Sequence, residues 1–252
     1  DIGVGGREVG YLFGQYKRLK NEYTGVLTGK GIPFGGSLAR TEATGYGLCY
    51  FAKEMLADAG KSFEGQRVVI SGSGNVAIYA NQKATQLGGK VIAMSDSNGY
   101  IVDENGIDYK VMKEIKEVKR ARIKTYLDYV PTAKYVEGSQ GIWTVPCDIA
   151  LPCATQNELD VEDAVMIVDN NARYYVEAAN MPATAEALKL LRLSPRVLTA
   201  GSKASGSGGV VVSALEMVQN SVRYSWSRKE VDDRLRSIMN NIYDLSAAAD
   251  RS

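Results

Sequence analysis

Histidine is missing from all 252 residues of the chain. Its absence excludes a Ser–His or Cys–His nucleophile pair and removes the commonest metal ligand, and we predict no metal site. It also removes the one side chain whose unperturbed pKa suits proton transfer near neutrality. Any proton chemistry by this chain therefore needs a carboxylate or a lysine whose pKa is shifted.

Long apolar runs are also missing, and none approaches the roughly 20 residues that span a bilayer. The chain has no signal-peptide pattern, and its cysteines (Cys49, Cys147 and Cys153) lack CxxC spacing. The formal net charge of +1 lacks the basic excess of a nucleic-acid surface. We expect a cytoplasmic protein with free thiols and no nucleic-acid or membrane partner. Because the sequence begins with Asp1 instead of Met and stops in DLSAAADRS, we also expect a fragment of a longer protein.

From residue 67 onward, short apolar strand patterns alternate with helical ones. The strand patterns are RVVIS, KVIAMS, CDIALP, RYYVEA and RVLTA. Continuous apolar strands between helices indicate a parallel sheet that is covered on both faces. We therefore predict an α/β fold with a doubly wound, mostly parallel, Rossmann-like sheet. Between these strands, NGYIVDENG is interpreted as a turn and residues 108–127 as a charged helix.

Helical spacing is also present on both sides of this alternation. Residues 7–20 carry apolar side chains at helical intervals, and a glycine-rich loop follows at 28–40. The next helix is predicted with Thr41 as its N-cap and Gly60 as its C-terminal stop. Residues 210–249 are predicted to be helical, with a break near Trp226.

The turn after the first strand reads GSGNVA, a GxGxxA pattern between a strand and a helix. The first glycine permits a tight turn, and the second lets a pyrophosphate approach the backbone. The helix N-terminus then offers free N–H groups to the phosphates. The alternative is a tight turn without a ligand. We predict a dinucleotide site, which comprises Gly72, Ser73, Gly74, Asn75 and Val76.

The second strand ends in Ser95, Asp96 and Ser97, and these residues leave the cofactor open. An acidic residue at this place normally binds the ribose 2′-hydroxyl of NAD, since its charge repels a 2′-phosphate. The flanking serines, together with the basic segment that follows, favour a 2′-phosphate instead. Asp96 is equally explained as a turn-former before Asn98-Gly99.

Three loops follow strands at the predicted carboxyl edge of the sheet, where open α/β sheets bind their ligands. They are residues 152–157, with Ala154 and Thr155, and residues 178–184 and 201–209. Each loop combines small residues with an amide, a hydroxyl or a lysine. The segment RTEATGYG is explained equally well as a capped helix start and as a place where a ligand approaches the helix.

Several motifs together resemble one family. DIGVGGREVGYLFGQYKR, FGGSLARTEATGYG, GSGNVA, PCATQNELD, EAANMP and GGVVVSALEMVQNS occur in order along nearly the whole chain. They closely resemble the hexameric glutamate dehydrogenases, above all the bacterial NADP-linked members. The resemblance implies reversible oxidative deamination of L-glutamate to 2-oxoglutarate and ammonia, and a homo-hexamer at full length. It also accounts for the missing histidine, because lysine and aspartate carry the proton transfer in this family.

The resemblance assigns roles to single positions. Asp1 matches the aspartate implicated in proton transfer, and Ser213 matches the serine that binds the substrate side-chain carboxylate. Thr44 and Asn75 match positions that contact the cofactor. Asn180 matches a position near the nicotinamide ribose.

The Ser95–Ser97 pattern also resembles the NADP-linked members, which favours NADP over NAD. Two positions depart from the family: Gly206 replaces a usual asparagine near the cofactor, and Ala183 replaces a usual hydroxyl residue. The family segment before Asp1, which carries the substrate lysines, is absent from this sequence.

We therefore expect residues 1–34 to be a remnant of a substrate domain with its hinge, and residues 35–252 to be a dinucleotide-binding domain. The expected parent activity is NADP-dependent glutamate dehydrogenase, while this chain alone is expected to bind NADP with little or no turnover. Two alternatives stay open. One is a leucine- or phenylalanine-type amino-acid dehydrogenase with the same fold. The other is a stand-alone nucleotide-binding module without catalysis.

Overall fold

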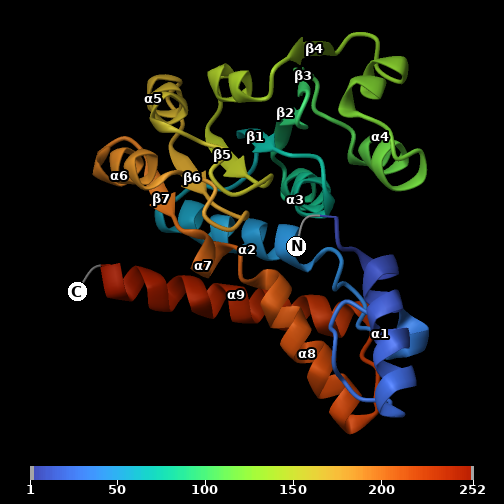
Figure 1. Cartoon of the computed structure of the whole chain (residues 1–252). Coiled ribbons are helices and arrows are strands. Elements are labelled where there is room, and N and C mark those ends of the chain that lie inside the picture. The colour runs from blue at the N-terminus through green and yellow to red at the C-terminus, as the bar shows by residue number, and fades with distance from the viewer. Residues whose placement is uncertain (1–2, 251–252) are drawn as a thin grey trace.

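A seven-stranded sheet forms the centre of the molecule, with the strand order β4-β3-β2-β1-β5-β6-β7 (Figure 1). The structure is a computed structural model that describes residues 3–250. Five strands run parallel, in the order β2-β1-β5-β6-β7, and β3 and β4 add an antiparallel edge. The strands are β1 (Arg67–Ser71), β2 (Lys90–Ser95), β3 (Gly99–Val102), β4 (Lys134–Glu137), β5 (Ile149–Pro152), β6 (Tyr174–Val176) and β7 (Leu198–Ala200).

Helices cover both faces of this sheet (Figure 1). Successive residues of β1 show this, since Val68 and Ile70 belong to one buried cluster and Val69 to another. The first cluster includes α2, α3 and α9, and the second includes α5 and α6. The predicted α/β, doubly wound, mostly parallel fold is thus confirmed. The helices are α1 (Gly6–Lys20), α2 (Ala43–Asp58), α3 (Asn75–Gln86), α4 (Tyr109–Lys113), α5 (Val161–Asp169), α6 (Ala185–Leu193), α7 (Ser202–Ser205), α8 (Gly208–Val222) and α9 (Arg228–Asp250).

Two segments between β2 and β5 differ from the prediction. NGYIVDENG contains the whole of β3, because Tyr100 and Ile101 pair with β2 and are buried. The predicted charged helix is interrupted: α4 passes into a π-helix (Glu114–Val118), and a 3-10 helix (Ile123–Asp128) follows later. Between them Arg120 has a left-handed backbone (φ 51°), which ends the helical run.

The ends of α2 give one correction and one confirmation. Thr41 is not the N-cap: Glu42 occupies that place in a helical conformation, without a side-chain capping bond. The Glu42 carboxylate instead accepts a 2.6 Å bond from Arg228 of α9. Gly60 does stop the helix, with a left-handed backbone (φ +66°), and the Gly60 and Lys61 N–H groups close the last turn.

The N-terminal segment packs on α8. In Figure 1, α1 and the loop that follows it lie beside α8, to one side of the sheet. The break between α8 and α9 falls at residues 223–227, as predicted near Trp226. Within residues 3–250, no helix has the length and apolar character to cross a membrane.

Candidate functional site

The glycine turn after β1 has the geometry that a pyrophosphate site requires. Gly72 has a φ of +87°, and a Cβ there would lie 3.0 Å from Ala154 Cα. Its N–H donates to Ser95 Oγ at 2.9 Å. Gly74 is exposed, has nothing within 4 Å of a built Cβ, and leads into α3 without a side-chain cap. The first amides of α3 are therefore open to a ligand.

The turn lies at the point where the sheet changes direction. From β1 the chain continues to β2 on one side, while β5 lies on the other side of β1. In doubly wound sheets the crevice at such a switch point is the usual ligand site. The turn and the loop after β5 lie next to each other at this switch point, and we call them its two walls.

A side-chain network joins these two walls. Ser71 Oγ accepts from the Cys153 N–H at 2.9 Å and donates to Glu158 Oε1 at 2.9 Å. The same Glu158 oxygen accepts from the Ala154 N–H at 3.1 Å. Burial raises the pKa of Glu158 to about 7, although its hydrogen bonds act in the opposite direction.

We expect the stability of the fold to depend on pH through Glu158. Between pH 4.5 and 7 the folded state keeps a proton on Glu158 that the unfolded state loses. The free energy of unfolding that the protonated group contributes below pH 4.5 is therefore lost as pH rises through 7. Glu158→Gln abolishes the titration. The free energy of unfolding of wild type should therefore fall relative to Glu158→Gln between pH 5 and 8, by up to about 3 kcal/mol. Urea unfolding at both pH values measures this, and parallel profiles would contradict it.

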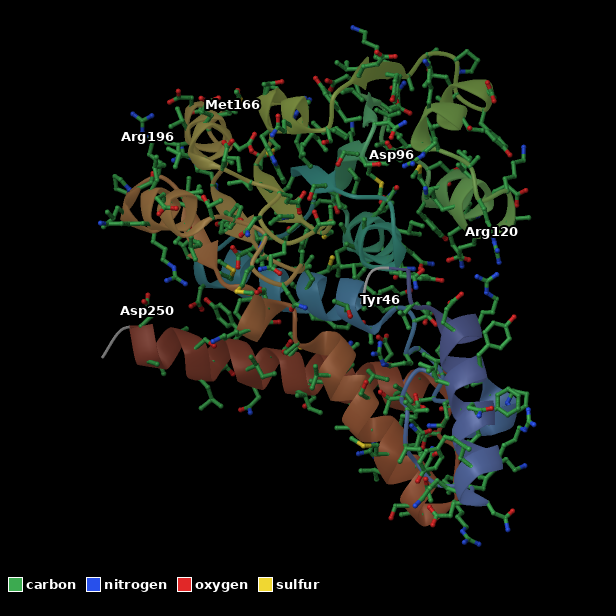
Figure 2. All side chains as sticks on the ribbon, in the orientation of Figure 1. Tyr46, Asp96, Arg120, Met166, Arg196 and Asp250 are labelled. Atoms are coloured by element: carbon green, nitrogen blue, oxygen red, sulfur yellow. The ribbon has the colours of Figure 1, made fainter. Side chains whose placement is uncertain are left out.

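Asp96, labelled in Figure 2, forms a turn with both carboxylate oxygens. Oδ1 accepts from the Asn98 N–H at 2.8 Å and from the Gly99 N–H at 3.3 Å. Oδ2 accepts from the Ile123 N–H at 3.0 Å. The turn-forming interpretation of Asp96 is thus confirmed. These N–H groups also compensate the carboxylate charge.

Basic side chains gather beside the neighbouring Ser97. Arg122 Nη1 donates to the exposed Ser97 Oγ at 2.9 Å. Lys116 interacts with both Asp96 and Arg122, and burial is the main cause that lowers the pKa of its ammonium group. A phosphate at Ser97 would meet a hydroxyl and a guanidinium together.

The backbone at the start of α2 packs closely against α3 and α8. A Cβ on Gly45 would lie 2.5 Å from the Ala80 N of α3 and 2.7 Å from the Val76 O. On α8, a Cβ on Gly209 would lie 2.4 Å from Thr44 Oγ1. These contacts place the predicted residue Thr44 between the glycine-turn helix and α8.

Ser213 lies on α8 and is held by two hydrogen bonds. Thr28 Oγ1 and Ser213 Oγ are 2.8 Å apart, and Arg40 Nε donates to the same Ser213 oxygen at 2.9 Å. Burial lowers the pKa of Arg40, whereas the Glu216 charge acts in the opposite direction. Since Ser213 Oγ accepts from Arg40, its own proton is available to an acceptor.

The loop that carries Asn180 rests on α7. The Met181 N–H reaches Ser202 Oγ at 3.5 Å, and the Ser202 N–H donates to the buried Glu177 at 3.0 Å. Close by, a Cβ on Gly206 would lie 2.7 Å from the Ser202 O and 2.9 Å from the Ala178 O. The Ser202 and Ala178 carbonyl oxygens therefore occupy the space into which the usual asparagine would project.

The predicted residues form three groups around the switch point. Ser95 and Ala154 contact the glycine turn directly, and Thr44 is next to it through Gly45. Asp96 and Ser97 lie beyond the end of β2, and Ser213 lies on α8. Thr155 follows Ala154 in its loop. Asp1 lies outside the described residues.

Sequence reasoning missed the groups that connect these residues. Glu158 stands within the motif PCATQNELD, but its spacing gives no sign that it reaches back to Ser71. Arg40 stands within SLARTEATGYG, and its partner Ser213 is 173 positions away. Their occurrence in the recognised motifs was the only available signal.

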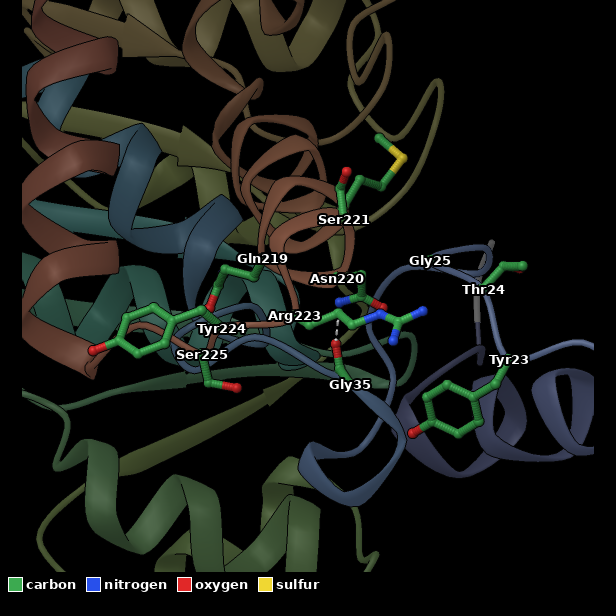
Figure 3. Close-up of a pocket in the computed structure, with 11 residues that line it drawn as sticks. Tyr23, Thr24, Gly25, Gly35, Gln219, Asn220, Ser221, Arg223, Tyr224 and Ser225 are labelled. Atoms are coloured by element: carbon green, nitrogen blue, oxygen red, sulfur yellow. Dashed lines mark hydrogen bonds between the residues drawn. The ribbon is translucent and has the colours of Figure 1, made fainter.

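A cavity lies away from this switch point, at the C-terminal end of α8. It has a volume of about 790 Å³ and is lined by residues 23–25, Gly35 and residues 217–225 in part. Figure 3 shows Asn220 at its centre, where Nδ2 donates to the Gly35 O at 2.6 Å.

The sheet order, the glycine turn and the open start of α3 define a Rossmann-like α/β domain of the nucleotide-binding class. The sequence model described as Glutamate/Leucine/Phenylalanine/Valine dehydrogenase matches residues 35–251. The chain belongs to this family.

Similar proteins agree with this assignment. The NADP-specific glutamate dehydrogenase of Helicobacter pylori is 51% identical over 249 residues, which are 96% of this chain and 55% of that protein. The NAD(P)-specific glutamate dehydrogenase of Xylanibacter ruminicola is 51% identical over 246 residues, again 96% and 55%. A Plasmodium falciparum glutamate dehydrogenase structure matches with a TM-score of 0.90 and 47% identity, covering 96% of this chain and 52% of that one. The chain spans about half the length of the curated relatives it matches.

Proposed function

We propose that the chain supplies the cofactor-binding part of an NADP-dependent glutamate dehydrogenase. The parent reaction is the reversible oxidative deamination of L-glutamate to 2-oxoglutarate and ammonia. The observation that carries the proposal is the uncapped start of α3 behind Gly74, at the switch point of a chain that is 51% identical to an NADP-specific relative. NADP, when bound, would accept the hydride from the substrate Cα.

The residues present fit such a cofactor. Gly72 holds the turn against Ala154, and Gly74 leaves the approach to the first amides of α3 open. Ser73, Asn75 and Val76 complete this cradle, which suits a pyrophosphate. On the nicotinamide side we propose contacts from Ala154, Thr155 and Asn180, with Thr44 at the start of α2.

The choice of NADP over NAD is supported by the surroundings of Ser97. The Asp96 carboxylate is already bound by three backbone N–H groups, and Arg122 lies on the Ser97 hydroxyl. A phosphate at this place gains charge-assisted hydrogen bonds from Arg122. We propose that Ser95, Asp96 and Ser97 form the end of the site that receives the 2′-phosphate.

Replacing Arg122 by alanine should separate the two cofactors. The loss of one charge-assisted contact is expected to weaken NADP binding by about tenfold or more, with little effect on NAD. Isothermal titration of wild type and variant with NADP and NAD measures this. Lys124→Ala is the matched control, because it also removes a nearby positive charge. The Lys124 ammonium group pairs with the Glu137 carboxylate at 3.9 Å instead of contacting Ser97. Tighter binding of NAD than NADP by wild type would overturn the cofactor assignment.

For the substrate, Ser213 is the proposed contact to the side-chain carboxylate. Its oxygen accepts from Arg40, so its proton is free to be donated to a carboxylate. A carboxylate-binding serine favours glutamate over the apolar substrates of leucine- or phenylalanine-type enzymes. A panel of amino acids tested on the full-length enzyme distinguishes them, since preference for an apolar substrate would contradict the proposal.

We also propose the division into residues 1–34, a substrate-domain remnant with its hinge, and residues 35–252, the dinucleotide-binding domain. Asp1 is proposed to serve in proton transfer in the full-length enzyme, which we expect to be a cytoplasmic hexamer. Residues 1–252 alone should bind NADP with little or no glutamate-dependent turnover. Normal NADPH formation by this chain alone would contradict that expectation.

A further inference from the structure

Glu158 connects the two walls of the switch point by hydrogen bonds. It accepts from the hydroxyl of Ser71, which directly precedes the glycine turn, and from the Ala154 N–H on the opposite wall. Ala154 is also the residue against which Gly72 packs. Together with the Cys153 N–H bond to Ser71 Oγ, this carboxyl group therefore helps to set the position of the turn relative to the loop.

Glu158 accepts three hydrogen bonds, from the Ser71 hydroxyl and from the Ala154 and Thr155 N–H groups, and the first two fall on the same oxygen. Oε1 accepts from the Ser71 O–H and from the Ala154 N–H. A proton on Oε2 would therefore leave the two Oε1 bonds in place, whereas the Thr155 N–H favours the ionised form. The two bonds that join the walls are thus compatible with either protonation state.

Within residues 3–250, the titratable groups that act on Glu158 include no cation, so only its hydrogen bonds favour the ionised form. These titratable groups are Asp163 from α5, Cys153 after β5 and Tyr175 of β6. Asp163 is itself an acid, and burial raises the pKa of Cys153 and of Tyr175 well above their usual values, so both stay neutral near pH 7. A pyrophosphate at the adjacent turn adds further negative charge, and like charges disfavour ionisation.

We propose that Glu158 is a positioning residue for the dinucleotide and takes up a proton when the dinucleotide binds at the glycine turn. This inference rests on the proposed function of the turn. As a neutral acid Glu158 holds the walls together without repelling the phosphates. The pKa of about 7 that burial gives the free protein puts this proton uptake within the physiological range.

The consequence is a pH-dependent affinity. As pH rises from 6 to 8, Glu158 of the free protein loses its proton. Binding of the dinucleotide then requires the uptake of a proton from solvent, which costs more free energy the higher the pH. NADP affinity should fall by roughly three- to tenfold over this range, if the phosphates raise the carboxyl pKa by one to two units. Glu158→Gln keeps the acceptor oxygen and mimics the neutral acid, so it should bind more tightly than wild type at pH 8 and equally at pH 6.

Isothermal titration of the 252-residue chain tests this. Wild type and Glu158→Gln are titrated with NADP and with NAD at pH 6, 7 and 8, in two buffers of different ionisation enthalpy. Wild type should take up a fraction of a proton near pH 7 that Glu158→Gln does not. NAD has no 2′-phosphate, whose own titration near pH 6 would otherwise contribute. The matched control is Glu104→Gln, an exposed carboxylate that pairs with Arg67 at 2.8 Å and should leave the profile unchanged.

A second variant tests the hydrogen bonds between the two walls separately from the protonation of Glu158. Glu158→Leu removes the acceptor, and weaker binding than wild type at all three pH values would support the positioning role. Equal pH profiles of NAD affinity for wild type and Glu158→Gln, or wild-type NAD affinity that falls with falling pH, would overturn the inference. No binding of either dinucleotide by folded wild type would overturn the proposed function together with it.

Discussion

Lys30→Met is expected to lower the free energy of unfolding by about 3–5 kcal/mol, because it leaves a buried carboxylate without its counter-charge. Lys30 Nζ and Glu216 Oε1 are 2.7 Å apart, and both side chains are 0% exposed. The only other described donor to this carboxylate is the Gly29 N–H, at 2.9 Å. Urea denaturation, followed by circular dichroism, measures the loss.

Two further variants show that burial is the cause. Lys30→Met combined with Glu216→Leu removes both charges and should recover most of the stability. Glu104→Ala breaks an exposed pair, whose side chains are 39% and 62% exposed, and should change stability by less than about 1 kcal/mol. A loss below about 1 kcal/mol for Lys30→Met would show that water reaches Glu216.

Gly45→Ala should be almost as damaging, for a steric reason. A Cβ at Gly45 meets the α3 backbone, 2.5 Å from the Ala80 N and 2.7 Å from the Val76 O. Backbone atoms cannot move aside as the end of a flexible side chain can, so α2 and α3 must separate. We expect a loss of about 3 kcal/mol. Because Val76 belongs to the glycine turn, NADP binding by the remaining folded protein should also weaken.

Two glycines of α1 provide the control. A Cβ at Gly10 or at Gly14 meets nothing within 4 Å. Alanine at either place should therefore stabilise the helix, by roughly 0.5–1 kcal/mol. The same substitution is thus expected to have opposite signs in two helices, and a stable Gly45→Ala variant would refute the close packing of α2 on α3.

The parallel part of the sheet was predictable because each of its strands is a short apolar run. RVVIS and KVIAMS are buried on both faces, and such runs stand out against the helical spacing around them. β3 was missed because GYIV begins at Gly99, directly after Asn98, so turn residues dominate the pattern. Its pairing with β2 is an interaction between two strands, which no single segment reveals.

The candidate site was predictable only where a short run of neighbouring residues determines the local backbone geometry. The glycine turn needs a particular order of small residues, so it is visible in the sequence. Ser95 was predicted as a cofactor contact, but the structure adds a bond to the Gly72 N–H that the pattern did not indicate. Glu158 and Arg40 depend on partners that are 87 and 173 positions away, and nothing local encodes such contacts.

The hydrogen bonds between residues 28–30 and α8 affect the order in which the chain can fold while the ribosome makes it. Thr28, Gly29 and Lys30 each bond to α8, to partners that lie 185 to 187 positions later in the chain. At about 5–20 residues per second, the ribosome makes those partners on the order of 10–40 s after Lys30. During that interval the ammonium group that is later buried stays in water. Residues 28–30 are therefore made well before their partners and are among the last of the described residues to reach their native place.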